Sequence, residues 1–102
     1  MKEKFAAAQV TRVLDQALMY QCACPAQVCR SIFELRDLYD YQMNCSNTTE
    51  QDQAVHKAIA GAAARAHAQM EECLAEVLAI EGWDMATLTM PEGLRAKVLK
   101  PL

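Results

Sequence analysis

Apolar side chains recur every three or four positions along most of this sequence, which is the spacing of a stripe on one side of a helix. The first repeat comprises Val10, Val13, Leu14, Ala17 and Leu18. The second has Val28, Ile32, Leu35 and Tyr39 on one side, and Arg30, Glu34 and Asp37 on the other. The third comprises Ile59, Ala62, Ala66, Met70, Cys73, Val77 and Ile80, at near-heptad spacing. These repeats predict three main helices, at residues 2–21, 25–43 and 49–81.

Helix-starting residues indicate where the second and third helices begin. Pro25 suits the first position of the second helix, where its missing N–H costs nothing, and Cys24 then takes the N-cap position. The segment 44–49, NCSNTT, is the clearest loop in the chain. Thr48 with Gln51 three residues later has the pattern of a capping box that opens the third helix.

A separate short region follows the third helix. Gly82 is a natural helix stop, because glycine readily adopts the left-handed conformation. Asp84 is placed to cap a brief turn, and Pro91 opens a last short helix. The apolar residues of this region either fold back over the end of the bundle or present an anchor to a partner. They are Trp83, Met85, Leu88 and Met90.

The composition and length favour one helical domain. Glycine and proline each occur only three times in 102 residues, while alanine, leucine, methionine, glutamate and glutamine, which favour helix, are abundant. A reversal of the chain near Ser46 makes the second and third helices antiparallel. We therefore predict an all-α fold for a single domain, residues 1–102. It is an antiparallel helical bundle of three main helices plus a short C-terminal helix.

The length of the third helix raises the question of what covers it. At about 1.5 Å per residue it would be near 50 Å long, against about 30 Å for the second helix. Either the first helix or a second subunit must cover the overhang. The run AIAGAAARAHA at 58–68 has small side chains that allow close helix packing, although high helix propensity explains it equally well. We predict a homodimer with this helix near the interface.

Charge and hydropathy exclude several classes of partner. The net charge is −3, so there is no basic excess to neutralise the phosphates of a nucleic acid. No apolar run approaches the roughly 20 residues needed to cross a bilayer, and residues 1–16 lack the long apolar core of a signal peptide. The odd number of cysteines, five, argues against a complete disulfide framework. We expect a cytoplasmic protein that binds neither nucleic acid nor membrane.

Three of the five cysteines lie close together in the segment YQCACPAQVCRS. They are Cys22, Cys24 and Cys29, and an antiparallel hairpin brings Cys73 to the same level. A thiol at a helix N-terminus has a lowered pKa, and thiolates are ligands for zinc, copper(I) and iron–sulfur clusters. These four residues are therefore candidate metal ligands or redox-active thiols, with His67 as a further candidate ligand.

Other features of the cysteines favour simple packing. The spacing C-x-C-x4-C is not the C-x2-C pair of structural zinc sites. Cys24 and Cys29 lie about 140° apart around a helix, and free cysteine commonly packs as a small hydrophobe. His67 can equally be a buried histidine with hydrogen-bond partners.

No catalytic constellation stands out. The Glu-x-x-His motif of di-iron bundles is missing, and there is neither a glycine-rich phosphate loop nor a G-x-S-x-G elbow. Glu71 and Glu72 are interpreted as a solvated helix edge. We expect a non-enzymatic module for protein interaction or assembly; the alternative is a thiolate-based metal-binding or redox-sensing protein.

Overall fold

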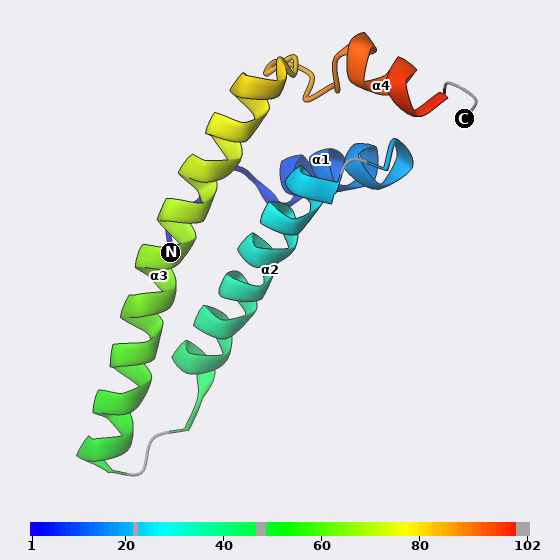
Figure 1. The fold of residues 1–102 in the computed structure, drawn as a ribbon. Helices are drawn as coiled ribbons and strands as arrows, with labels where there is room; N and C mark the ends of the chain where they lie inside the picture. Colours follow the sequence, from blue (N-terminus) through cyan, green and yellow to red (C-terminus); the bar gives the residue numbers. More distant parts are fainter. Residues whose placement is uncertain (22, 47–48, 100–102) are drawn as a thin grey trace.

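Four helices make up most of the chain. The structure is a computed structural model that describes residues 1–21, 23–46 and 49–99. The helices are α1 (Ala7–Met19), α2 (Ala23–Asn44), α3 (Glu50–Glu81) and α4 (Glu92–Leu99) (Figure 1). The described residues contain no strand, only an isolated bridge between Asp84 and Thr89. The all-α prediction is confirmed.

The two longest helices form an antiparallel hairpin that sets the shape of the molecule. α2 and α3 lie side by side along an axis of about 60 Å, while the other two extents are 24 and 18 Å. α1 crosses the upper end of α2, and α4 lies beyond the end of α3 (Figure 1). The predicted reversal of the chain between the second and third helices is confirmed. Away from α1, the hairpin is only two helices wide.

The predicted helix boundaries need two corrections. α1 begins at Ala7 rather than at residue 2, because residues 1–6 are not helical and Lys4 and Phe5 bond to α3 and α2. α2 begins at Ala23, so Cys24 lies inside the first turn and does not cap the helix. For α3, the N-cap is Thr49, whose hydroxyl accepts a hydrogen bond from the Asp52 N–H at 3.0 Å. The predicted cap at Thr48 lies outside the described residues.

The core lies where α1 crosses the hairpin and the segment 82–91 returns to meet it. Its buried members are Phe5, Val10, Val13, Cys29, Ile32, Leu74, Leu78, Trp83, Leu88 and Met90. Gly82 ends α3 with a φ of 83°, as predicted. The side chain of Asp84 accepts hydrogen bonds from two N–H groups of the following turn, also as predicted. The buried Gln16 side chain accepts a further one from the Met90 N–H at 2.7 Å. The apolar residues of this segment therefore fold back over the bundle end, except Met85, which is exposed.

The buried stripe of α3 is not the repeat that stands out in the sequence. Its buried residues are Ala60, Ala63, His67, Glu71, Leu74 and Leu78. The predicted repeat, beginning at Ile59 and ending at Ile80, lies about 110° around the helix from this stripe and is half-buried or exposed. α3 thus carries two stripes with helical spacing, and α2 covers only one of them. None of the described helices is long and apolar enough to cross a membrane.

Candidate functional site

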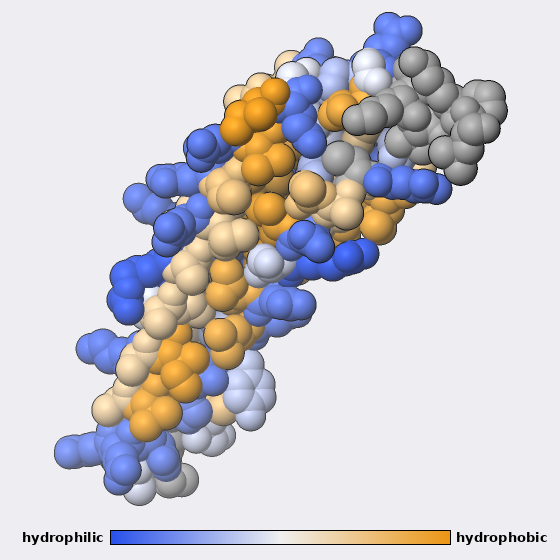
Figure 2. Space-filling view, viewed as in Figure 1, coloured by the Kyte–Doolittle hydropathy of each residue, from blue (hydrophilic) through white to orange (hydrophobic). Residues whose placement is uncertain are grey.

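α3 has an apolar face that the rest of the described chain covers only in part. We call it the open face, and it consists of Val55, Ile59, Ala62, Ala66, Met70, Cys73, Val77 and Ile80 of α3 with Leu35 and Leu38 of α2. Val55 is 49% exposed, Ile80 77% and Leu38 40%, which are high values for large apolar side chains. In Figure 2, apolar residues extend along the visible side of α3 and sideways onto α2. The exposed apolar surface is therefore continuous and is not a set of scattered side chains.

A groove between α2 and α3 forms the lower part of the open face. Its volume is about 390 Å³. The lining residues are Leu35, Leu38, Ala58, Ile59, Ala62, Ala63 and Ala66. None of these side chains carries a polar or ionisable group. The groove can therefore accept apolar side chains, but the residues that line it offer no acid, base or nucleophile.

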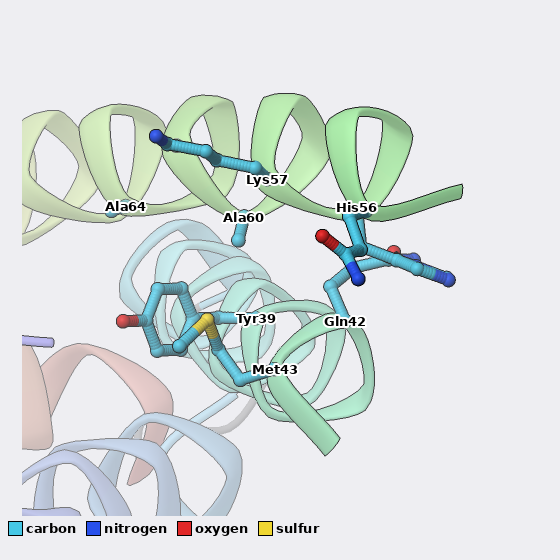
Figure 3. A pocket seen from close by; sticks show the side chains of 9 residues that line it. Tyr39, Gln42, Met43, His56, Lys57, Ala60 and Ala64 are labelled. Carbon is cyan, nitrogen blue, oxygen red and sulfur yellow. The ribbon is translucent and has the colours of Figure 1, made fainter. Parts of the chain in front are cut away.

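A second groove lies on the other side of the hairpin (Figure 3). It has a volume of about 520 Å³ and is lined by Tyr39, Gln42, Met43, Gln53, His56, Lys57, Ala60, Gly61 and Ala64. His56 Nδ1 lies 2.5 Å from Gln42 Oε1. This contact joins α2 and α3 across the groove. The second groove is thus more polar than the first and its histidine is already paired.

A buried network of charged groups joins α2, α3 and the N-terminal segment. Arg36 is 7% exposed and Glu71 3%, and Arg36 Nη2 donates to Glu71 Oε2 at 3.2 Å. The same Nη2 donates to the Phe5 carbonyl at 2.6 Å. Arg36 Nε lies 3.3 Å from the carboxylate of Glu3. Interpreting Glu71 as part of a solvated edge was wrong, because this residue faces α2 and meets a buried cation there.

Glu71 also fixes the first residues of the chain. Its Oε2 accepts hydrogen bonds from the backbone N–H of Lys4 at 2.7 Å and of Phe5 at 2.9 Å. With both donors satisfied, the Phe5 ring packs into the core, where it is 6% exposed. The sequence carried one signal for this network: Arg36 follows Cys29 and Ile32 at the spacing of the buried stripe of α2.

His67 is fully buried beside Arg36 and Glu71. Its Nε2 accepts a hydrogen bond from Arg36 Nε at 2.9 Å, which places the proton of the neutral ring on Nδ1, 3.6 Å from Glu71 Oε1. Burial lowers the pKa of His67 below its usual 6.5; the nearby carboxylates of Glu71 and Glu3 oppose this shift, and Arg36 adds to it. Both ring nitrogens thus face groups of this chain, and the prediction that His67 ligates a metal stays a prediction.

The lowered pKa of His67 predicts a pH-dependent stability. In the unfolded chain His67 binds a proton near pH 6.5, whereas in the folded protein it stays neutral to lower pH. The free energy of unfolding is therefore unaffected by His67 well above pH 6.5 and falls as the pH drops from 6.5 toward the folded pKa. The slope is at most one proton, about 1.4 kcal/mol per pH unit. In urea denaturation between pH 7.5 and 5.5, His67→Gln is expected to flatten this slope. An unchanged slope in the variant would show that other groups cause it.

The cysteines lie in different surroundings. Cys24 is exposed in the first turn of α2, and Cys73 is half-buried on the open face. Cys29 is fully buried in the core, where burial raises the pKa of its thiol to about 11, so this thiol is protonated at neutral pH. Cys22 lies outside the described residues.

The cysteine-based metal site receives no support from this arrangement. Within the described parts of the chain, no three cysteine, histidine, aspartate or glutamate side chains are grouped so that they would hold a metal ion. A ligand set of Cys22, Cys24, Cys29 and Cys73 for zinc, copper(I) or an iron–sulfur cluster stays a prediction.

No protein-family model matches the chain, and neither a curated protein nor a solved structure matches it.

Proposed function

We propose that this protein is a non-enzymatic helical module for protein interaction or assembly, and that it binds its partner through the open face. The observation that carries the proposal is the continuous exposed apolar surface along α3, with its groove against α2. Large contiguous apolar patches on a folded chain are typical of interaction sites, because exposing them to water is unfavourable.

The architecture explains why a partner would be needed. Each helix of the hairpin covers one side of the other, and α1 adds a third layer only near the upper end of α2 (Figure 1). Farther down, the buried residues of α3 are the small Ala60 and Ala63, which contribute little apolar area. A further helix laid against the open face would bury Val55, Ile59 and Leu38 together.

The chemistry of the groove indicates the kind of partner. Its lining is aliphatic, with alanines on α3 and leucines on α2, so polar or charged ligands gain no hydrogen bond there. An amphipathic helix with apolar residues every three or four positions matches such a groove. The open face from Val55 to Ile80 is about 38 Å long, which is enough for seven helical turns of a partner.

A photo-crosslinking experiment tests this proposal. Benzoylphenylalanine is introduced at Ala62 on the open face, and in a second variant at Ala79, which is also exposed but lies about 100° around α3 from Ala62. After irradiation in the producing cells, we expect a defined crosslinked product from position 62 and none from position 79. If position 62 gives no product while circular dichroism shows a folded chain, the proposed function is wrong.

A further inference from the structure

We infer that the occupant of the open face is a second copy of this chain, whose α3 lies antiparallel to the first around a two-fold axis near residues 67 and 68. The inference rests on the proposed function and adds the partner and its register. In this register the open-face residues pair at equal distances from the axis. The pairs are Val55 with Ile80, Ile59 with Val77, Ala62 with Cys73, and Ala66 with Met70.

Side-chain size favours this register over a parallel one. The small residues of the open face, Ala62 and Ala66, lie before its midpoint near residue 67, and the larger Met70 and Cys73 lie after it. In the antiparallel arrangement each alanine meets a larger residue, so that the two helices interdigitate. The last turns of α3 in the partner subunit then lie over the groove beside Leu38. A parallel pair would place alanine against alanine, which leaves a gap, and Ile80 against its own copy.

Charge along α3 points the same way. Between residues 54 and 79, the exposed charged residues on one flank of the open face are Arg65 in the first half of α3 and Glu72 and Glu76 in the second. An antiparallel two-fold pair brings this flank of one copy to the same flank of the other, so that Arg65 of one copy comes toward Glu72 of the other. In a parallel two-fold pair the same flanks lie on opposite sides of the interface, so Arg65 of one copy would not approach Glu72 of the other.

One specific ion pair follows from the register. Arg65 and Glu72 are both exposed and lie seven residues apart, so they share one flank of the open face. Across the two-fold axis, Arg65 comes within about 2 Å, measured along the helix, of the level of Glu72 in the partner subunit. The symmetry makes this contact twice in each dimer.

Disulfide trapping tests the register directly. Ala62→Cys is expected to form a disulfide between chains with the native Cys73. Within one chain these positions are about 16 Å apart along α3, too far for a disulfide, so any such bond joins two copies. Mass spectrometry of the oxidised dimer identifies the linked peptides. In the matched control, Ala79→Cys, no bond to Cys73 is expected. A Cys73–Cys73 bond, or no bond from position 62, would overturn the antiparallel register.

Sedimentation of the full chain tests the dimer itself. The unmodified chain is expected to have twice the monomer mass, and Ala62→Glu to weaken association at least about 100-fold, because a carboxylate then enters an apolar interface. Ala79→Glu, with the same change on an exposed site outside the open face, should remain dimeric. Arg65→Glu should weaken association about tenfold, and Arg65→Glu with Glu72→Arg should restore it.

The sedimentation and crosslinking results together distinguish failure of the dimer from failure of the proposed function. In one outcome the chain is a monomer, but position 62 still gives a crosslinked product whose mass differs from that of two copies. This outcome would overturn the second-copy inference and leave the proposed interaction module in place. A monomer without any product would contradict both. A dimer unaffected by Ala62→Glu would assign the contact to another surface and overturn the inference.

Discussion

Replacing Glu71 with leucine is expected to lower the free energy of unfolding by about 3–5 kcal/mol, the range measured when one partner of a buried ion pair is removed. The variant leaves Arg36, which is 7% exposed in the unmodified protein, with only the exposed Glu3 as a counter-ion. It also removes the acceptor of the Lys4 and Phe5 N–H groups. Urea denaturation followed by circular dichroism measures the loss.

A control and a double variant make this result interpretable. Glu34→Leu changes an exposed glutamate of α2 in the same way and should alter the stability by no more than about 0.5 kcal/mol. Arg36→Met combined with Glu71→Leu should cost less than the sum of the two single changes, because no unpaired buried charge remains. Equal effects of Glu71→Leu and Glu34→Leu would show that the network does not contribute to folding.

The helices and their order were predictable because each one obeys local rules. Gly82 stops α3 in the left-handed conformation, the loop after Asn44 reverses the chain, and the apolar residues after Gly82 return to the core. Each of these features depends on a few neighbouring residues. The start of α1 was less predictable, because tertiary contacts of Lys4 and Phe5 compete with a helix there.

The orientation of α3 was not predictable from its own sequence. Its two apolar stripes differ by one position, and the stripe that faces α2 contains His67 and Glu71. A pattern of apolar residues alone selects the other stripe, because it treats a buried charged residue as a surface one. Arg36 on the facing helix compensates the burial of both side chains, and the Lys4 and Phe5 N–H groups add two hydrogen bonds to Glu71.

The stripe of α3 that does not face α2 is the candidate site. The repeat from Ile59 to Ile80 predicted helical spacing correctly, but the fold leaves these residues half-buried or exposed. The open face is therefore the surface through which the third helix would form the expected dimer, and this dimer stays a proposal. For the cysteines, proximity along the chain was a poor guide to proximity in space. Because α2 begins at Ala23, Cys24 and Cys29 both lie in this helix and point in different directions around it.

Trp83→Ala is expected to destabilise the protein by about 3–5 kcal/mol, the usual cost of removing a buried tryptophan. Trp83 is 4% exposed in the core at the end of α3, and its indole Nε1 donates to Glu81 Oε1 at 2.8 Å. Met85, two residues later, is 47% exposed, so Met85→Ala should cost less than about 1 kcal/mol. Because Trp83 is the only tryptophan, both variants are compared by circular dichroism.

This comparison also decides between the two readings of the segment 82–91. If Trp83 holds the segment against α1, its loss lowers stability at every protein concentration, and Met90 loses the packing that accompanies its bond to Gln16. If Trp83 instead anchors a partner, the monomer should keep its stability and only association should weaken. We expect the first result, because a side chain with 96% of its surface already covered by its own chain has almost none left for a partner.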